Sequence, residues 1–253
     1  MFEITTSLAL ILILAAFLAG LVDSIAGGGG LITVPVLLLC GLSPAQALAT
    51  NKLQGCFGSG TAAITYARAG HVQPLGQWRM GLVAAGASAL GALLALALPA
   101  DLLKAVMPFI LIAVALYFWL KPGLSEASRT ERVSPLVFGA TMVPLVAFYD
   151  GFFGPGAGSF YMLGFVLLAG HGMLKATAHT KLLNFASNLG SLIVFAFGGH
   201  ILWALGLAMA AAQVAGAFIG ARLAMRIGSG LIRPLLVVVC LTLAARLLWQ
   251  SFL

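Results

Sequence analysis

The chain contains one sequence plan written twice. The segment VDSIAGGGGLITVP…ALATNKLQ, residues 22–54, returns in altered form as YDGFFGPGAGSFYM…ATAHTKLL, residues 149–183. Asp23 corresponds to Asp150 at a shift of 127 residues, and Lys52 corresponds to Lys181 at a shift of 129. Repeated halves in a strongly apolar chain are typical of secondary transporters, whose binding sites lie between the repeats near the bilayer midplane. The repeat therefore predicts small-solute transport.

Composition places the chain in the membrane. Of 253 residues, 62% are hydrophobic and 8% are charged, which excludes an ordinary soluble domain. A spanning helix needs about 20 apolar residues, so the chain accommodates roughly ten segments and no separate enzyme domain. The net charge of +7 would favour nucleic acid in a soluble protein, but here the basic residues gather in loops between apolar segments, so we expect a lipid bilayer and no nucleic acid as partner.

Each half divides into five helical segments. The first half spans residues 1–120, a linker covers 121–132, and the second half spans 133–253, all within one integrated transport domain. Because five is odd, the second copy is expected to be inverted. The fold class predicted is an all-α polytopic membrane protein with two inverted-topology repeats of about five segments each and glycine-broken helices near the midplane. The segments are 4–22, 31–41, 44–68, 79–98 and 102–120, then 133–149, 158–170, 173–198, 202–221 and 231–250.

The positive charges indicate the same inversion. Arg68 and Arg79 flank a loop whose counterpart near His200 carries no Lys or Arg, and the loop with Arg222, Arg226 and Arg233 has a counterpart with only Lys104. The positive-inside rule then places the arginine-rich loops and the linker 121–132 in the cytoplasm and both termini in the periplasm. This favours ten crossings. A re-entrant segment at 31–41 would make the halves parallel and remains the alternative.

The stretch after each aspartate is rich in glycine. Four glycines in a row do not hold a stable helix, because each costs roughly 1 kcal/mol relative to alanine, and irregular backbone in the hydrocarbon region must be buried in protein or line a wet cavity. We expect the chain to be unwound there, with the amino end of the short helix 31–41 pointing inward, where free N–H groups suit an anion. The glycines are Gly27, Gly28, Gly29 and Gly30, repeated as Gly154, Gly156 and Gly158.

Two lysines lie deep in apolar segments. Ser43 and Pro44 predict a helix start, which places Asn51 and Lys52 about 12 Å inward. Lys181 lies at a similar depth, beside His179 and Thr180. Intramembrane lysines usually face a cavity or a partner. One interpretation is a cationic anion site formed by both lysines with their polar neighbours; the other is internal ion pairing of the lysines with the two aspartates.

The two aspartates also have two interpretations. Asp23 and Asp150 are either proton-coupling carboxylates or caps on the glycine turns, since Asp commonly accepts hydrogen bonds from local backbone N–H groups. His179, beside a cation, is expected to be a neutral hydrogen-bond donor or proton acceptor. No cofactor and no metal site are predicted, because the histidines and the three cysteines lack ligand spacing.

Two stretches of small residues predict close helix packing. Ala87 to Gly91 and Gly216 to Gly220 are repeat-related and let helix backbones approach each other. Packing within one chain is the main interpretation, and a homodimer face is the alternative. Trp78, Trp119, Trp203 and Trp249 stand at segment edges, where amphipathic rings anchor at the headgroup level.

Four segments resemble the signatures of a known family. GLVDSIAGGGGLITVP, ALATNKLQ, FYDGFFGPGAGSF and KATAHTKLLN are similar to those of the TauE/SafE (TSUP) sulfite and sulfonate exporters, especially the YfcA-type branch, over nearly the whole chain. The resemblance implies a bacterial inner-membrane permease for small sulfur-containing anions, coupled to an ion gradient. The family's binding features correspond to residues 27–30, Asn51, Lys52, residues 154–158 and Lys181.

Other classes of protein explain the sequence less well. An enzyme needs a nucleophile and base, or a metal set, facing one cavity, and no such set is present in the pattern, so no enzyme is expected. A passive structural or partner-binding membrane protein has no need of buried lysines and broken helices. An anion channel remains an alternative within transport, although inverted repeats favour a carrier.

Overall fold

The computed structural model describes residues 6–103, 105–107, 109, 113 and 130–227. The regular elements in these residues are all helices, which confirms the all-α prediction. The predicted segment 231–250 and most of 102–120 lie outside the described residues. The first half contains α1 (Thr6–Ala26), α2 (Gly29–Leu39), α3 (Pro44–Arg68), the 3-10 turn η1 (Pro74–Gly76) and α4 (Trp78–Ala97). The second contains α6 (Pro135–Ala140), α7 (Met142–Phe152), α8 (Ala157–Leu167), α9 (Met173–Phe197) and α10 (Trp203–Ile227).

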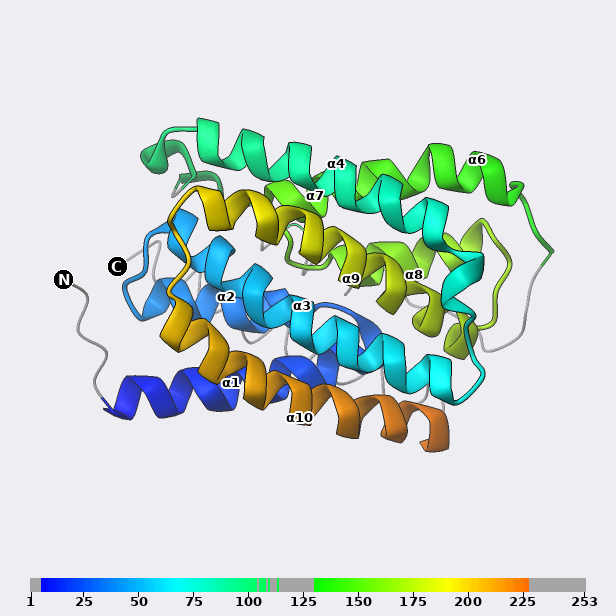
Figure 1. Ribbon diagram of the computed structural model, residues 1–253, viewed down its shortest axis with the longest axis horizontal. Helices are drawn as coiled ribbons and strands as arrows, with labels where there is room; N and C mark the ends of the chain where they lie inside the picture. Colours follow the sequence, from blue (N-terminus) through cyan, green and yellow to red (C-terminus); the bar gives the residue numbers. More distant parts are fainter. Residues whose placement is uncertain (1–5, 104, 108, 110–112, 114–129, 228–253) are drawn as a thin grey trace.

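The long helices lie side by side along the long axis of the molecule (Figure 1). Within the described residues, five helical stretches are long and apolar enough to cross a membrane: α1, α4, α6 with α7, α9 and α10. The helices α2 and α8 have 11 residues each, about 16 Å at 1.5 Å per residue, which is roughly half of a 30 Å hydrocarbon core. The chain is therefore a multi-pass membrane protein.

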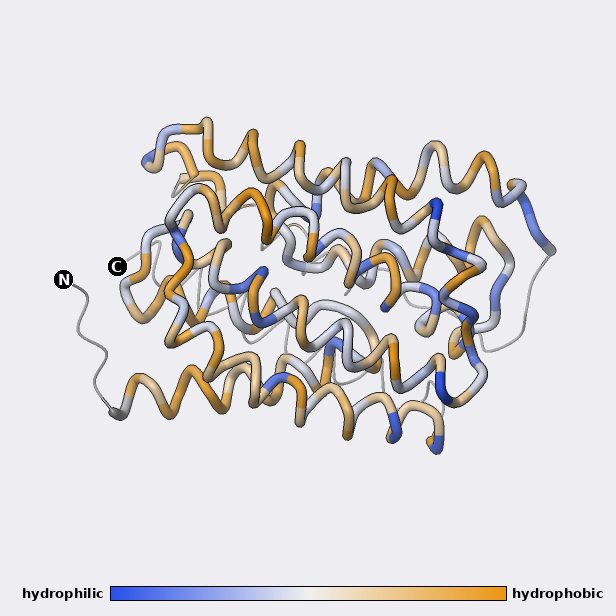
Figure 2. The backbone as a smooth tube through the Cα atoms, in the orientation of Figure 1, coloured by the Kyte–Doolittle hydropathy of each residue, from blue (hydrophilic) through white to orange (hydrophobic). Residues whose placement is uncertain are grey.

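Apolar side chains cover the outside of this bundle. Leu14, Leu90 and Ile193 are about half exposed or more, on α1, α4 and α9. The residues of α1 are coloured mainly as hydrophobic in Figure 2. Trp78 and Trp203 are the first residues of α4 and α10 and are 56% and 53% exposed. An apolar surface with tryptophans at helix ends fits a surrounding bilayer.

Corresponding helices of the two halves run in opposite directions. In Figure 1, α3 runs from the left end of the molecule to the right, whereas α9 runs from right to left, and α4 and α10 are likewise opposed. The right-hand end contains the end of α3 and the start of α4, which carry Arg68 and Arg79. The end of α10, with Arg226 in its last turn, lies there too.

The two halves interlock through their helices. α1 packs against α10, and α4 packs against α7 and α9, so each close pair joins one half to the other. A side chain at Gly91 of α4 would overlap the Phe148 carbonyl of α7, and one at Gly216 of α10 would overlap the Phe17 carbonyl of α1. Both small-residue stretches therefore pack within the chain, as the main interpretation predicted, and neither half buries its helices alone.

Glycines break the helices where the sequence predicted. Gly27 and Gly28 have φ angles of 77° and 102° between α1 and α2, and Gly154 and Gly156 have 95° and 86° between α7 and α8. These left-handed conformations are open to glycine without steric cost. The unwound part is shorter than predicted, because Gly29 and Gly30 already belong to the first turn of α2.

Several helix boundaries differ from the prediction. α1 continues to Ala26 instead of residue 22, and α10 continues to Ile227 instead of 221. The predicted segment 133–149 is interrupted at Thr141, between α6 and α7. Pro144 in the first turn of α7 lacks the N–H that would bond back to residue 140, which explains the interruption.

Candidate functional site

Two buried ion pairs join the halves at the centre of the bundle. Lys52 Nζ lies 2.6 Å from Asp150 Oδ1, and Lys181 Nζ lies 2.9 Å from Asp23 Oδ2. The lysine side chains are 1% and 0% exposed. Each lysine thus binds the aspartate of the opposite half. The ion-pair interpretation describes this structure, and the four charges sum to zero.

The helix starts fix the depth of both lysines. Ser43 caps α3: its Oγ accepts the Gln46 N–H at 3.3 Å, and the Gln46 side chain accepts the Ser43 N–H at 3.1 Å. Lys52 is the ninth residue of α3, and Lys181 is the ninth residue of α9. Both therefore lie about 12 Å from the start of their helices. Because α3 and α9 begin at opposite ends of the bundle (Figure 1), the lysines enter the centre from opposite sides.

Asp23 forms an ion pair with Lys181 and also caps the start of α2. Its Oδ2 receives Lys181, and its Oδ1 accepts the backbone N–H of Gly29 at 3.2 Å. Gly29 is the first residue of α2, so the carboxylate satisfies one of the free donors at that helix start. The cap and the ion pair coexist at this residue, and the Gly29 N–H that was expected to face an anion is already bound to a carboxylate.

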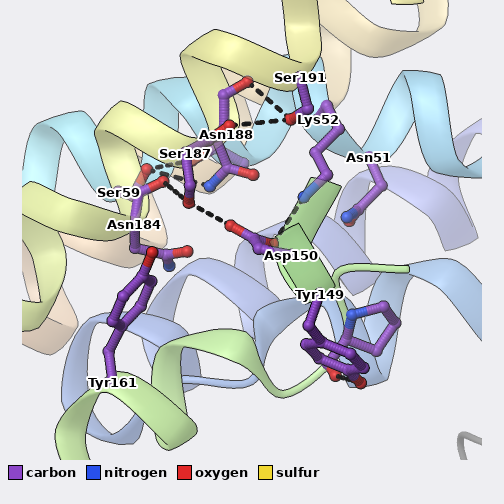
Figure 3. Close-up of polar contacts among 12 residues, drawn as sticks. Asn51, Lys52, Ser59, Tyr149, Asp150, Tyr161, Asn184, Ser187, Asn188 and Ser191 are labelled. Atoms are coloured by element: carbon purple, nitrogen blue, oxygen red, sulfur yellow. Dashed lines mark hydrogen bonds and ion pairs between the residues drawn. The ribbon is translucent and has the colours of Figure 1, made fainter. Parts of the chain in front are cut away.

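Asp150 has a different second partner. Its Oδ1 receives Lys52 from α3, and its Oδ2 accepts a hydrogen bond from the Ser187 hydroxyl of α9. Figure 3 shows Lys52 and Ser187 approaching this carboxylate from two sides. Ser187 Oγ also lies 3.1 Å from the Asn184 carbonyl oxygen. We call each aspartate, together with its lysine and its second hydrogen-bond partner, a corner of the site. The second partner is a side-chain hydroxyl at the Asp150 corner and a backbone amide at the Asp23 corner.

A small cavity lies between the two corners. It offers about 30 Å³ to the centres of water molecules, enough for about two waters at 10–15 Å³ each. Neither lysine lines it, because an aspartate covers each ammonium. The lining is acidic, amide or glycine in character and comes from both halves: Asp23, Gly28, Gly29, Gly30, Asn51, Gly55, Asp150, Gly154, Gly156, Gly158, Asn184, Asn188 and Gln213.

Most of the glycines proposed from the sequence line this cavity. Gly27 instead lies in close contact with the start of α8. A side chain at Gly27 would overlap the Ser159 N–H group of α8, and the Ser159 hydroxyl donates to the Ala26 carbonyl at 3.0 Å. Gly27 therefore permits the two glycine turns to touch. Asn51 holds its amide oxygen toward Thr33 at 2.6 Å and Gln54 at 3.3 Å.

Four lining residues were not predicted as binding residues from the sequence: Gly55, Asn184, Asn188 and Gln213. Asn188 Nδ2 lies 3.5 Å from Ser59 Oγ, and these two positions correspond at the repeat shift of 129. Because Ser59 and Asn188 occupy corresponding positions, their contact lies on the boundary between the two halves. The available signal was the presence of single amides in apolar helices, which usually face a cavity.

His179 and Thr180 are not brought to this cavity. Residues two apart on a helix point in different directions, so His179 faces away from Lys181 and lines a second cavity of about 210 Å³ with His171 and Gln77. The two imidazole rings lie 4.7 Å apart. The Thr180 hydroxyl is buried and has no hydrogen-bond partner among the described residues.

His171 stands at the rim of this second cavity, in the loop before α9. Its ring stacks on Phe165 with centroids 5.5 Å apart. Partial burial lowers its pKa below the ordinary 6.5, and the nearby Lys175 ammonium lowers it further. The neutral imidazole is therefore the favoured form at neutral pH.

The described residues contain no group of three His, Cys, Asp or Glu side chains placed to hold a metal ion. What the centre can do chemically is set by its lysines and carboxylates. A buried ion pair costs desolvation energy that its attraction only partly returns, and removing one partner leaves a costly unpaired charge. A charged ligand can therefore replace one partner when the released group is neutralised. The arrangement suits reversible exchange of charged partners.

The fold and centre define a class of protein: a multi-pass membrane protein with an internal, charge-neutral polar site. The comparisons narrow this class. The model of the family "Sulfite exporter TauE/SafE" matches residues 12–247. The chain therefore belongs to the TauE/SafE family, as the four signature segments predicted.

Curated relatives carry transporter names. The chain is 58% identical to "Probable membrane transporter protein ORF9" of Sinorhizobium sp. over 237 residues, covering 94% of this chain and 91% of that protein. It is 46% identical to "Probable membrane transporter protein YfcA" of Escherichia coli K12 over 252 residues, covering 99% and 93%. A Haemophilus influenzae "Probable membrane transporter protein" is 42% identical, covering 98% of both chains. No solved structure matches the chain.

Proposed function

We propose that this protein is a secondary transporter of small anions, specifically sulfur oxyanions or organosulfonates, that works by alternating access between two inverted repeats with proton coupling. The observation that carries the proposal is the reciprocal pairing of Lys52 with Asp150 and of Lys181 with Asp23 between the halves. The family description and the names of the relatives support membrane transport of this kind. In this proposal the membrane is the bacterial inner membrane, the linker 121–132 is cytoplasmic and both termini are periplasmic.

The ion pairs explain how an anion binds to a centre without net charge. An entering anion competes with a carboxylate for a lysine ammonium. The released carboxylate is costly as a buried unpaired charge, and a proton removes this cost by neutralising it. Anion and proton thus bind together, which couples the flux of one to the gradient of the other. The amides of Asn51 and Asn184 at the cavity supply donors for anion oxygens.

The size and position of the cavity support alternating access over a channel. Space for about two waters is too small for an open ion pathway. Lys52 and Lys181 each lie about 12 Å from the first residue of their helix, α3 or α9. These helices begin at opposite ends of the bundle, so each lysine is nearer to one side. Opposed helix directions and interlocked halves are the arrangement that inverted-repeat carriers use.

Tracer flux in proteoliposomes tests the proposal. Sulfite, thiosulfate and a sulfonate panel are offered under imposed pH gradients to wild type, Lys52→Ala and Lys181→Ala. Lys175→Ala is the matched control, because Lys175 lies on α9 like Lys181 but is exposed. We expect saturable flux of at least one anion that both central substitutions abolish and the control retains.

Three results would contradict the proposal. Flux that does not saturate points to a channel. Flux that survives in both folded central variants removes the lysines from the site. No flux of any anion by the folded wild type leaves a structural or partner-binding role.

A further inference from the structure

We infer that the coupling proton is carried by Asp150 and that Asp23 is the fixed carboxylate, so that the two corresponding acids have separate roles. This inference rests on the proposed function, because it assigns a proton site within that transporter. It comes from the difference in the second hydrogen-bond partner of each aspartate. The sequence alone left capping and coupling open for both.

The Asp23 corner disfavours a bound proton. Both oxygens of this carboxylate face groups that only donate: the Gly29 N–H at 3.2 Å and the Lys181 ammonium at 2.9 Å. A proton on either oxygen would point at a donor hydrogen and would lose that hydrogen bond. Hydrogen bonds to a charged group contribute about 1.5–3 kcal/mol each, so loss of one makes protonation about tenfold or more less favourable. This carboxylate is built to stay charged.

The Asp150 corner accommodates a proton without losing its hydrogen bond to Ser187. Ser187 donates its hydroxyl hydrogen to Asp150 Oδ2, and a hydroxyl both donates and accepts. When Oδ2 takes up a proton, the acid donates to Ser187 Oγ. The serine hydrogen then turns to the Asn184 carbonyl oxygen, which already lies 3.1 Å from Ser187 Oγ. The contact is kept in both protonation states.

The two repeats have different residues at the position of this serine. Ser187 corresponds to Gly58 at the shift of 129, and Gly58 has no hydroxyl to offer Asp23. A side chain at Gly58 would lie 2.7 Å from the Gln213 side chain, so α10 occupies the space where a serine would stand. The hydroxyl beside a central carboxylate is therefore present at one corner and excluded at the other.

The charged groups around Asp150 define what its protonation does. Lys52 approaches from α3, Tyr161 from α8 and Ser187 from α9, and Tyr149 precedes Asp150 on α7. Asp23 of α1, paired with Lys181, lines the same cavity. α4, which packs on α7, presents the uncharged Ser88 there. A proton on Asp150 leaves Lys52 as an unpaired ammonium. One monoanion bound to that ammonium together with one proton on Asp150 carries no net charge, so transport is electroneutral.

Two measurements on liposome-reconstituted protein test the assignment. The first is infrared difference spectroscopy on acidification, which reads protonated carboxyl groups without requiring transport. We expect a carboxylic-acid band in wild type and in Asp23→Asn, and its loss in Asp150→Asn. The same band unchanged in Asp150→Asn, or lost only in Asp23→Asn, would overturn the assignment.

The second measurement separates coupling from exchange, using a sulfonate, whose strong-acid anion takes up no proton of its own. In Asp150→Asn, accumulation driven by a pH gradient is expected to fall by a much larger factor than exchange of labelled for unlabelled sulfonate without a gradient. Ser187→Ala is expected to reduce that accumulation about tenfold, and Ser187→Thr to restore it. Ser191→Ala is the control, because within the described part of the chain the Ser191 hydroxyl bonds only to backbone carbonyls of its own helix.

The outcomes distinguish the inference from the proposed function. Wild-type exchange with equal pH-driven accumulation in Asp150→Asn contradicts the proton site and leaves transport standing. Equal effects of Ser187→Ala and Ser191→Ala contradict the role of the serine. Absence of any wild-type flux contradicts the proposed function, and the infrared result then still decides which carboxylate binds a proton.

Discussion

The Asp23 and Asp150 corners begin from the same sequence plan and reach different chemistry. Both hold a buried lysine from the opposite half, at 2.9 Å and 2.6 Å. The first adds a backbone amide of α2, and the second adds a side-chain hydroxyl of α9. The exchange of glycine at position 58 for serine at 187 accounts for the hydroxyl, which only the Asp150 corner has. The two repeats thus keep the same lysine–aspartate ion pair, while the residues around each aspartate give it a different role.

Removing either central lysine is expected to lower the free energy of unfolding more than any other change considered below. Lys52→Ala and Lys181→Ala each leave an unpaired carboxylate in the centre, and loss of one partner of a buried pair costs about 3–5 kcal/mol. The free energy of unfolding is measured by detergent titration in mixed micelles. Lys175→Ala, on the surface of α9, is expected to change it by no more than about 0.5 kcal/mol.

A double substitution sharpens this result. Lys52→Met with Asp150→Leu removes both charges and is expected to recover most of the lost stability, because apolar replacements of a buried pair are often neutral. Transport is not expected to return. A double variant as unstable as Lys52→Ala would show that the pair is not the source of the effect.

Alanine substitution at Gly27 is expected to lower stability more than alanine substitution at Gly70, a glycine with a similar φ outside the site. Gly27→Ala adds a clash with the backbone of α8 to a left-handed φ of 77°, whereas Gly70→Ala meets φ of 79° with open space around it. The left-handed conformation costs roughly 1–2 kcal/mol for a residue with a side chain, and overpacking adds about 1–3 kcal/mol. Unfolding free energies of the two variants give the clash by difference. Equal values would refute tight contact between the turns.

Gly154→Ala tests the second turn by its function. Its added carbon would lie 3.1 Å from Lys52 Nζ, the end of a flexible side chain, at φ of 95°. We expect a smaller loss of stability than in Gly27→Ala and a larger loss of anion flux relative to protein that remains folded. Stability and flux falling in parallel in both variants would remove this distinction.

The helix starts provide a smaller contrast between the halves. α3 begins with the Ser43 capping box, whereas the corresponding residue at the start of α9 is Gly172, which has no side-chain cap. Ser43→Ala is expected to cost about 1 kcal/mol, and Ser43→Gly only a few tenths. Thermal unfolding in detergent orders the three proteins. An alanine variant as stable as wild type would exclude a contribution from the cap.

The smallest expected effect is a pH dependence at His171, whose counterpart in the first half is the buried Leu42. The pKa of His171 is lowered in the folded protein by burial and by Lys175, so the unfolded chain binds more protons below pH 6.5. Stability from this residue is present above the unfolded pKa and is lost as pH falls below it. Melting temperatures of wild type and His171→Gln between pH 7.5 and pH 5.5 test this. We expect a shallower decline in the variant.

Local signals predicted much of the fold. Ser43 and Pro44 fixed the start of α3, and its observed bounds agree with the predicted 44–68. The glycine breaks were correct in place because backbone conformation at glycine is a local property. The end of α1 was placed too early, because the Asp23 carboxylate that caps α2 lies inside α1, and hydropathy alone treats a charged residue as a boundary.

The partners of the central residues required the structure. Four charges in two halves allow several pairings, and only the crossing of α3 with α9 selects pairing between the halves. His179 was grouped with Lys181 because the two are close in sequence, although residues two apart diverge on a helix. Ser187 was missed because one serine in an apolar helix bonds to its own backbone as readily as to a ligand.

The interlocking of the halves has a consequence for how the protein is made. α1 is completed at Ala26, and its packing partner α10 begins at Trp203. At roughly 5–20 residues per second, the ribosome reaches α10 on the order of ten to forty seconds after α1 has emerged. During that interval Asp23 is in the bilayer before Lys181 has been synthesised. The newly inserted first half therefore depends on the insertion machinery or on water to shelter an unpaired acid, and the protein matures only when its last described helix arrives.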